Sequence, residues 1–401
     1  MMLSEKACPV PEPLSSRIAA ILFLAILFFV NFLGRFIFAP LMLSIEKEMG
    51  FSHSQAGTIF LMISLGFFLA QLGSGFVTLR LKHRGTIFVS GLGVGLALLA
   101  FEVAGSIGMV RVVLITLGLA AGLHLPSALA TITAMVRRED WGKALAVHQT
   151  APSLGLVLAP LISEALLRWF SWRNTVSIVG GFAITSAVFY IWRSRGGEFS
   201  GETPKPKIVK SLLTQPSVWA IIGLFALAIG GGVGTYAMLP LYLVSEGGME
   251  RGWANTLLGL SRISGLFMTF AAGWATDRIG EKQAISVVLF AGGLATILLG
   301  MGSDMWLVVF VFVQPALIAC FFPPGFAALS RVVSPSMRSV SSSLAIPLAF
   351  LFGAGVVPAA IGYMGQTYSF GLGISILGGL MLLGPLLAYR LNFQEYNEEG
   401  C

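Results

Sequence analysis

The hexapeptide Gly75-Phe76-Val77-Thr78-Leu79-Arg80 has a counterpart in the second half of the chain, Gly273-Trp274-Ala275-Thr276-Asp277-Arg278, which begins 198 residues later (273 − 75). The same offset relates four further pairs of residues: Pro126 and Pro324, Ala130 and Ala328, Gly155 and Gly353, Pro160 and Pro358. Agreement at the hexapeptide and at these four pairs indicates an internal repeat. In membrane proteins, two such halves usually hold a substrate between them and move against one another.

The composition indicates a membrane protein. Of 401 residues, 56% are hydrophobic and only 11% are charged. A helix of about 20 apolar residues spans the hydrocarbon of a bilayer, which can accommodate this much apolar surface. The 48 glycines fit the same interpretation, because membrane helices pack closely through small residues.

The apolar runs predict an all-α protein with twelve transmembrane helices in two six-helix bundles. The first six spans are expected near 17–43, 54–79, 86–103, 109–135, 142–167 and 174–193. The second six are expected near 216–244, 253–276, 284–303, 305–331, 338–364 and 368–391. We therefore divide the chain into a tail (1–16), a bundle (17–193), a central loop (194–215), a second bundle (216–391) and a tail (392–401).

Lysine and arginine predict the orientation, because they are enriched in cytoplasmic loops. With both termini in the cytoplasm, that side collects most of the basic residues, including Lys6, Arg80, Lys205 and Arg331. The opposite side keeps only Lys47, Arg111, Arg168, Arg173 and Arg251. We expect both termini inside and the protein in the cell inner membrane. The net charge of +7 is spread over short loops, so no nucleic-acid partner is expected.

These features resemble the major facilitator superfamily. Its loop after the second helix reads approximately Gly-x-x-x-Asp-Arg-x-Gly-Arg-Arg, and the second-half copy, Gly273 to Lys282, matches it well. The first-half copy differs, with Leu79 at the acid position and Lys82 at the second glycine. The segments Trp169 to Arg173 and Gly155 to Pro160 resemble two further family motifs.

The resemblance implies transport by alternating access, with a gate at the matching loop. Asp277 and Arg278, with Gly273 and Gly280, are the gating candidates. An Asp–Arg pair at a helix end can bridge to a neighbouring helix and must break when that face opens. The alternative is that these residues only fix the topology.

Two arginines fall well within predicted spans, Arg35 in helix one and Arg262 in helix eight. Each costs about 2.5–3.5 kcal/mol on insertion scales, so such residues are usually functional. Asn31 precedes Arg35 by four residues and shares its helix face. In the superfamily helix one lines the central cavity and helix eight flanks it, which implies an anion site. The alternative is neutralisation of the arginines by Glu102 or Glu164.

The other substrate-binding candidates are His124, Tyr236 and Gln314. His124 is also the candidate for carrying a coupling proton, because histidine titrates near neutral pH, with packing as the alternative. The run Gly230-Gly231-Gly232 with Gly234 weakens helix seven, which predicts either a bend during gating or close packing.

The leading interpretation is a secondary carrier for a small organic anion, driven by protons or by exchange. A proton-coupled drug exporter and a nontransporting membrane sensor are the alternatives. No nucleophile–base set, metal cluster or nucleotide loop is visible, so we expect neither an enzyme nor a cofactor or metal. The carrier is expected to function as a monomer in the lipid bilayer.

Overall fold

The computed structural model describes residues 11–194, 196–201, 206–333 and 337–393. The predicted cytoplasmic residues Lys6 and Lys205 lie outside these ranges. The described residues form helices and connecting loops, without a β-sheet. This confirms the prediction of an all-helical protein.

The first half contains seven α-helices and two short turns, and α8 follows in the connection to the second half. They are α1 (Leu14–Phe36), α2 (Phe38–Met49), α3 (His53–Leu99), η1 (Ala100–Glu102), α4 (Ile107–Gly122), α5 (His124–Met135), η2 (Arg138–Asp140), α6 (Trp141–Leu167), α7 (Trp172–Arg193) and α8 (Pro206–Leu213). Helix α8 was not predicted, since 194–215 was expected to be a polar loop. Its Leu212 is buried.

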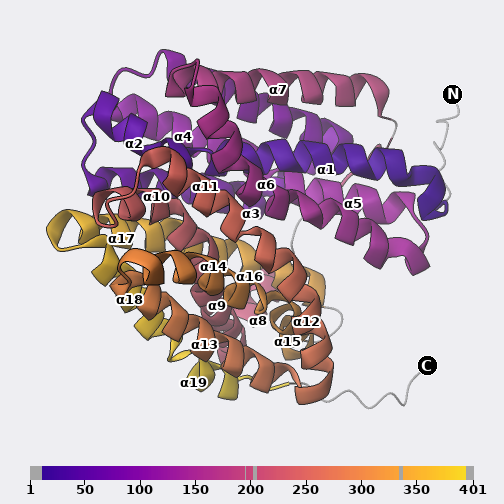
Figure 1. Ribbon diagram of the computed structural model, residues 1–401. Helices are drawn as coiled ribbons and strands as arrows, with labels where there is room; N and C mark the ends of the chain where they lie inside the picture. Colours follow the sequence, from indigo (N-terminus) through magenta and orange to yellow (C-terminus); the bar gives the residue numbers. More distant parts are fainter. Residues whose placement is uncertain (1–10, 195, 202–205, 334–336, 394–401) are drawn as a thin grey trace, which may run out of the picture.

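The second half follows the same order. It contains α9 (Pro216–Ile229), η3 (Gly230–Gly234), α10 (Thr235–Ser245), α11 (Arg251–Ser261), α12 (Ile263–Ile279), α13 (Glu281–Met301), α14 (Asp304–Ala319), α15 (Phe322–Val332), α16 (Arg338–Phe350), η5 (Leu351–Val356), α17 (Val357–Thr367), α18 (Phe370–Met381) and α19 (Gly384–Tyr389). Figure 1 shows the first half above and the second half below, with α10, α11 and α17 at the boundary.

Eleven helical segments of the described chain are long and apolar enough to cross a membrane. One of them contains α3, which has 47 residues and would be about 70 Å long as a straight helix. That is more than twice the thickness of the hydrocarbon core. The helix is interrupted at Lys82, whose φ is 57° and ψ is 173°.

Element boundaries repeat with the same offset that relates the sequence motifs. Helix α3 begins at His53, and α11 begins at the residue related to it by the repeat, Arg251. Lys82 corresponds to Gly280, and both have a positive φ, 57° and 79°. The first half thus places a lysine where the backbone conformation favours glycine.

A second repeated feature is an acid near the end of the second helical segment of each half. Glu48 accepts hydrogen bonds from Trp172 Nε1 (2.7 Å) and Arg173 Nε (2.7 Å) at the start of α7. Glu246, its counterpart in the repeat, accepts from the backbone N–H of Phe370 and of Gly371 at the start of α18. The same acid therefore fixes corresponding helices in both halves.

Many predicted spans are divided by short breaks. Three breaks lie three residues before a proline, which cannot donate to the carbonyl four positions earlier: Ile37 before Pro40, Leu123 before Pro126, and Phe321 before Pro324. The glycine run of predicted helix seven forms a wider π-helical turn, η3. The break between α11 and α12 has no such proline and lies at Arg262.

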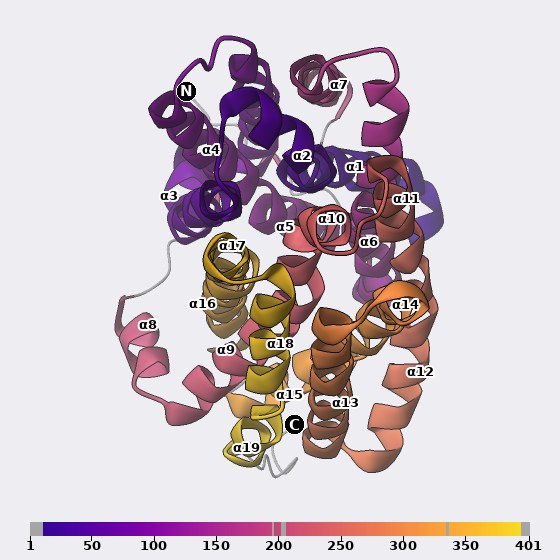
Figure 2. The same ribbon diagram turned by 60° about the vertical axis from the view of Figure 1, so that its left-hand side comes forward.

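The halves meet through α2, α3 and α6 of the first half and α10, α11, α16 and α17 of the second. Figures 1 and 2 both show α12, α13 and α19 on the side of the second half that is remote from the first. The largest apolar cluster runs through both halves and includes the buried rings of Phe36, Phe60, Tyr236 and Phe370. The halves therefore share a continuous apolar contact.

Glycine allows α3 and α4 to pack with their backbones in contact. A methyl group added at Gly118 would lie 2.1 Å from the carbonyl oxygen of Ile63, and one at Gly66 would lie 2.2 Å from that of Ile115. Gly108, in the same helix α4, has nothing within 4 Å of the corresponding position.

We expect Gly118→Val to lower the melting temperature of the purified protein by several degrees, because the added side chain forces the two backbones apart. Gly108→Val is the matched control and should leave it nearly unchanged. Equal melting temperatures for both variants would contradict this account of the α3–α4 contact.

Candidate functional site

Arg35 lies one residue before the end of α1 and is only 4% exposed. Its guanidinium carbon lies 4.4 Å from the ring centroid of Phe67, 5.0 Å from that of Phe32 and 5.6 Å from that of Phe36. Within the described chain it forms no ion pair, and its Nε has no hydrogen-bond partner. Aromatic faces, which attract cations, surround this charge.

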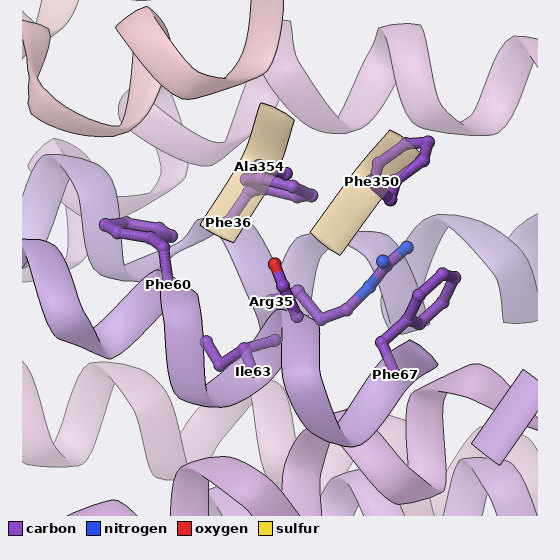
Figure 3. A pocket seen from close by; sticks show the side chains of 8 residues that line it. Arg35, Phe36, Phe60, Ile63, Phe67, Phe350 and Ala354 are labelled. Atoms are coloured by element: carbon purple, nitrogen blue, oxygen red, sulfur yellow. The ribbon is translucent and has the colours of Figure 1, made fainter. Parts of the chain in front are cut away.

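A small cavity adjoins Arg35, with a volume of about 10 Å³, which is room for roughly one water molecule. Figure 3 shows the side chains that line it: Arg35, Phe36, Phe60, Ile63, Ser64, Phe67, Phe350 and Ala354. Phe350 and Ala354 belong to the second half, and the others belong to the first. The Phe67 and Phe350 rings are 5.9 Å apart. Arg35 therefore lies at the contact between the halves.

Arg262 lies at the break between α11 and α12 and is 9% exposed. Its Nη1 donates a hydrogen bond to the carbonyl oxygen of Gly232 (3.1 Å). Its guanidinium carbon lies 5.0 Å from the ring centroid of Tyr236, and its Nε has no partner. It too is a buried cation beside an aromatic face.

Tyr236 connects the surroundings of the two arginines. Its hydroxyl donates to the carbonyl oxygen of Leu156 in the first half (3.2 Å). Its ring meets that of Phe36 edge to face, with centroids 6.4 Å apart. Phe36 and Tyr236 therefore form a path of aromatic contacts from Arg35 to Arg262, and Arg262 does not line the cavity at Arg35.

Neither acid proposed as a counter-ion neutralises an arginine of the site. Glu102 accepts a hydrogen bond from Ser177 Oγ (2.7 Å). Glu164 forms an ion pair with Arg251 (3.2 Å). Across the described residues, Arg35 and Arg262 thus have no carboxylate partner, and the counter-ion interpretation is wrong.

Gln314 lies beside the glycine turn η3. Its Nε2 donates to the carbonyl oxygen of Gly231 (2.8 Å) and to Thr296 Oγ1 (3.1 Å). Arg262 and Gln314 thus bind adjacent carbonyls of this turn, Gly232 and Gly231. Two side chains thus donate hydrogen bonds to carbonyl oxygens of the π-helical turn η3.

Asn31 and His124 lie elsewhere in the first half. Asn31 Nδ2 donates to Ser90 Oγ (3.3 Å) and to the carbonyl oxygen of Ala121 (3.2 Å), joining α1 to its neighbours. The His124 ring stacks on Phe28, with centroids 5.4 Å apart, and lies 6.0 Å from His148. His124 Nε2 is buried without a partner.

The gating candidates lie at the far end of α12. Asp277 and Arg278 are exposed, and the guanidinium carbon of Arg278 lies 3.8 Å from the ring centroid of Trp274. Gly280 has a φ of 79° and lies between α12 and α13, and a methyl group added at Gly273 or at Gly280 would have nothing within 4 Å. The ion pair of this region joins Glu281 to Arg331 (2.9 Å) instead.

A polar contact between the halves was not predicted from the sequence. Glu164 of α6 faces Arg251 and Asn255 of α11, and Asn255 also reaches α2. The repeat relates Glu164 and Asn255 to Gly362 and Gly57, and the structure shows that these glycines also meet across the halves.

Comparisons with known proteins agree with this architecture. The chain is 25% identical over 301 residues to the membrane sensor protein UhpC of Escherichia coli (strain K12), which covers 69% of this chain and 67% of that protein. It is 22% identical over 392 residues to a D-galactonate transporter of Escherichia coli O6:H1, which covers 85% and 87%.

A solved structure of a bacterial homologue of the human lysosomal transporter Spinster superposes with a TM-score of 0.75. It covers 93% of this chain and 91% of that chain at 16% identity. The family model described as "Major Facilitator Superfamily" matches residues 24–305, which is well over half of the chain. The chain therefore belongs to the Major Facilitator Superfamily, whose members are membrane transporters and not enzymes.

Proposed function

We propose that this protein is a secondary carrier that moves a small organic anion across the cell inner membrane by alternating access. One observation carries the proposal. Arg35 and Arg262 are buried without a carboxylate partner within the described chain, at or near the contact between the halves. A buried charge is strongly unfavourable unless it is paired, so an anionic ligand would stabilise the site.

The chemistry of the two side chains favours a carboxylate or a similar group. Guanidinium binds planar oxyanions through paired hydrogen bonds and stays charged. The rings of Phe32, Phe36 and Phe67 give Arg35 apolar surroundings, and a low dielectric strengthens an electrostatic contact there. The relative described as a D-galactonate transporter carries a sugar acid, which supports the anion class.

The proposal includes twelve spans with both termini in the cytoplasm, the two bundles at 17–193 and 216–391, and a functional monomer. The length of α3 and its interruption at Lys82 support two crossings by that helix. The loop charges support the orientation. Protons or exchange would drive transport, and His124 beside His148 is the candidate proton carrier.

Replacement of Arg35 or Arg262 by Gln should weaken anion binding about 10-fold to a few hundred-fold, since a charge-assisted hydrogen bond contributes about 1.5–3 kcal/mol. Lys should restore binding only in part, because it lacks the planar fork. If both arginines hold one ligand, the double variant should lose less than the sum of the two losses. Calorimetric titration with a panel of carboxylates and phosphate esters measures these affinities.

The control for this experiment is Arg168→Gln, which changes an exposed arginine outside the site. Its affinity should equal that of the wild type. Unchanged anion affinity and uptake in Arg262→Gln would contradict the anion site. Binding of cationic or neutral compounds alone would favour the drug exporter.

We also propose that Asp277 and Arg278 gate the cytoplasmic face. Asp277→Asn should slow uptake into proteoliposomes while leaving anion affinity nearly unchanged, because the residue is exposed and lies in α12, whereas Arg35 lies in α1 of the other half. Glu139→Gln, an exposed acid of the first half, is the control. Equal uptake rates for Asp277→Asn and the wild type would leave these two residues as topology signals.

A membrane sensor is the second candidate, because one relative is described as the sensor protein UhpC. Purified protein in proteoliposomes distinguishes the two. A carrier should accumulate or exchange labelled anion at rates well above those of empty liposomes, and Arg35→Gln should lower these rates at anion concentrations below saturation. Anion binding that is not accompanied by any flux would support the sensor.

A further inference from the structure

Two helix pairs join the halves at the end of the molecule where α2 ends and α11 begins. One pair is α3 with α17, and the other is α11 with α6. The repeat relates them, because α11 corresponds to α3 and α17 corresponds to the second part of α6. A symmetric ancestor would have had two equivalent contacts here. In this chain the two contacts differ in chemistry.

The contact between α3 and α17 is made by glycine. A methyl group added at Gly362 would lie 3.1 Å from the Cα of Gly57 and 2.5 Å from the carbonyl oxygen of His53. One added at Gly57 would lie 2.5 Å from the carbonyl oxygen of Pro358. The two backbones thus touch, as small residues allow in membrane helices.

The contact between α6 and α11 is polar at the corresponding positions. The repeat relates Asn255 to Gly57 and Glu164 to Gly362. Asn255 Nδ2 donates to Glu164 Oε2 (3.0 Å) and to the carbonyl oxygen of Pro40 (3.3 Å). Arg251 Nη2 donates to Glu164 Oε1 (3.2 Å). We call Glu164, Arg251 and Asn255 the polar lock.

The correspondence continues one turn further along the helices. In α11, a methyl group at Gly259 would lie 2.8 Å from the carbonyl oxygen of Val157 in α6. At the related positions, one at Gly355 would lie 3.4 Å from the Cα of Leu61 in α3. The two interfaces therefore have the same register, and the difference at the polar lock is a substitution within one shared geometry.

The two contacts respond differently to separation of the halves. The side chains of Glu164 and Arg251 are 19% and 39% exposed, so water can replace their partners when they part. Partly exposed ion pairs of this kind contribute little net stability, which makes them easy to break and re-form. The glycine contact offers only close packing, and packing energy falls steeply with a small gap.

We propose that the polar lock is the releasable closure of this end of the carrier, and that the α3–α17 glycine contact is the pivot about which it opens. This inference rests on the proposed alternating access. It adds the residues that set the equilibrium between the closed and open arrangements at this end of the molecule. Glu164, Arg251 and Asn255 are positioning residues in it, because they act on the arrangement of the halves and do not touch the ligand.

Spin labels on the two sides of this end test the proposal without any substrate. Labels replace Ala165 and Trp253 to report the α6–α11 side, and Lys47 and Tyr363 to report the α3–α17 side. All four positions are exposed. The native cysteines Cys8, Cys320 and Cys401 are first replaced by Ser. Pulsed electron spin resonance then gives the distance distribution of each pair.

Glu164→Gln keeps an acceptor for Asn255 but removes the charge that Arg251 binds, and Arg251→Gln breaks the same ion pair from the other half. Both should raise the long-distance population of the Ala165–Trp253 pair about 1.5- to fivefold, because a partly exposed ion pair contributes about 0.2–1 kcal/mol. The Lys47–Tyr363 pair should change less. Arg111→Gln, which changes an exposed arginine outside the lock, is the control and should match the wild type.

Melting temperatures close to that of the wild type show that each variant is folded, and the two variants test one contact independently. The proposal is overturned if neither variant changes the Ala165–Trp253 distances, or if the Lys47–Tyr363 pair lengthens as much. These distances are measured without added anion, so they do not test the anion site. A negative result for the polar lock would therefore not contradict the anion site, and a negative result for the anion site would not contradict the polar lock.

Discussion

The burial of two guanidinium groups in a low-dielectric interior is the main physical constraint on this structure. Arg35 and Arg262 have few ways to offset the loss of water. The structure uses aromatic faces at both, and a backbone carbonyl at Arg262. These contacts hold the cations in place without neutralising them. Local backbone irregularity accompanies each: Arg35 lies at the end of α1, and Arg262 lies at a break and binds the turn η3.

The proposed anion site would link ligand binding to the arrangement of the halves. The cavity beside Arg35 has walls from both halves, and it is too small for an organic anion in this conformation. The hydroxyl of Tyr236 bonds to Leu156 across the same contact. A ligand that reaches Arg35 must therefore displace Phe350 or its neighbours. Binding and movement of the halves would share one set of contacts, which is the physical basis of alternating access.

The repeat gives the two halves the same elements but not the same contacts. Both halves keep the same element order, the same acid at Glu48 and Glu246, and the same positive φ at Lys82 and Gly280. The interfaces between them have diverged at single positions within a common register. At one interface, glycines hold the halves together by close packing. At the other, the carboxylate of Glu164 and the amide of Asn255 hold them together by hydrogen bonds that water can replace. In the proposed mechanism, this difference lets one interface of a symmetric scaffold open more readily than the other.

The sequence by itself determined the fold class, the membrane setting and the repeat. Each follows from local properties: the length of apolar runs, and one offset shared by distant motifs. It also identified Arg35 and Arg262, because a charge within an apolar run is visible without coordinates. The tertiary structure decided which partners these residues have. These contacts join residues that are distant in sequence. They are the aromatic rings around Arg35, the bonds of Glu164 to Arg251 and Asn255, and the hydrogen bonds of Asn31 and Gln314. Such pairings depend on which helix faces meet, and the apolar pattern of a membrane helix does not specify this, because its lipid-facing and buried sides are both hydrophobic.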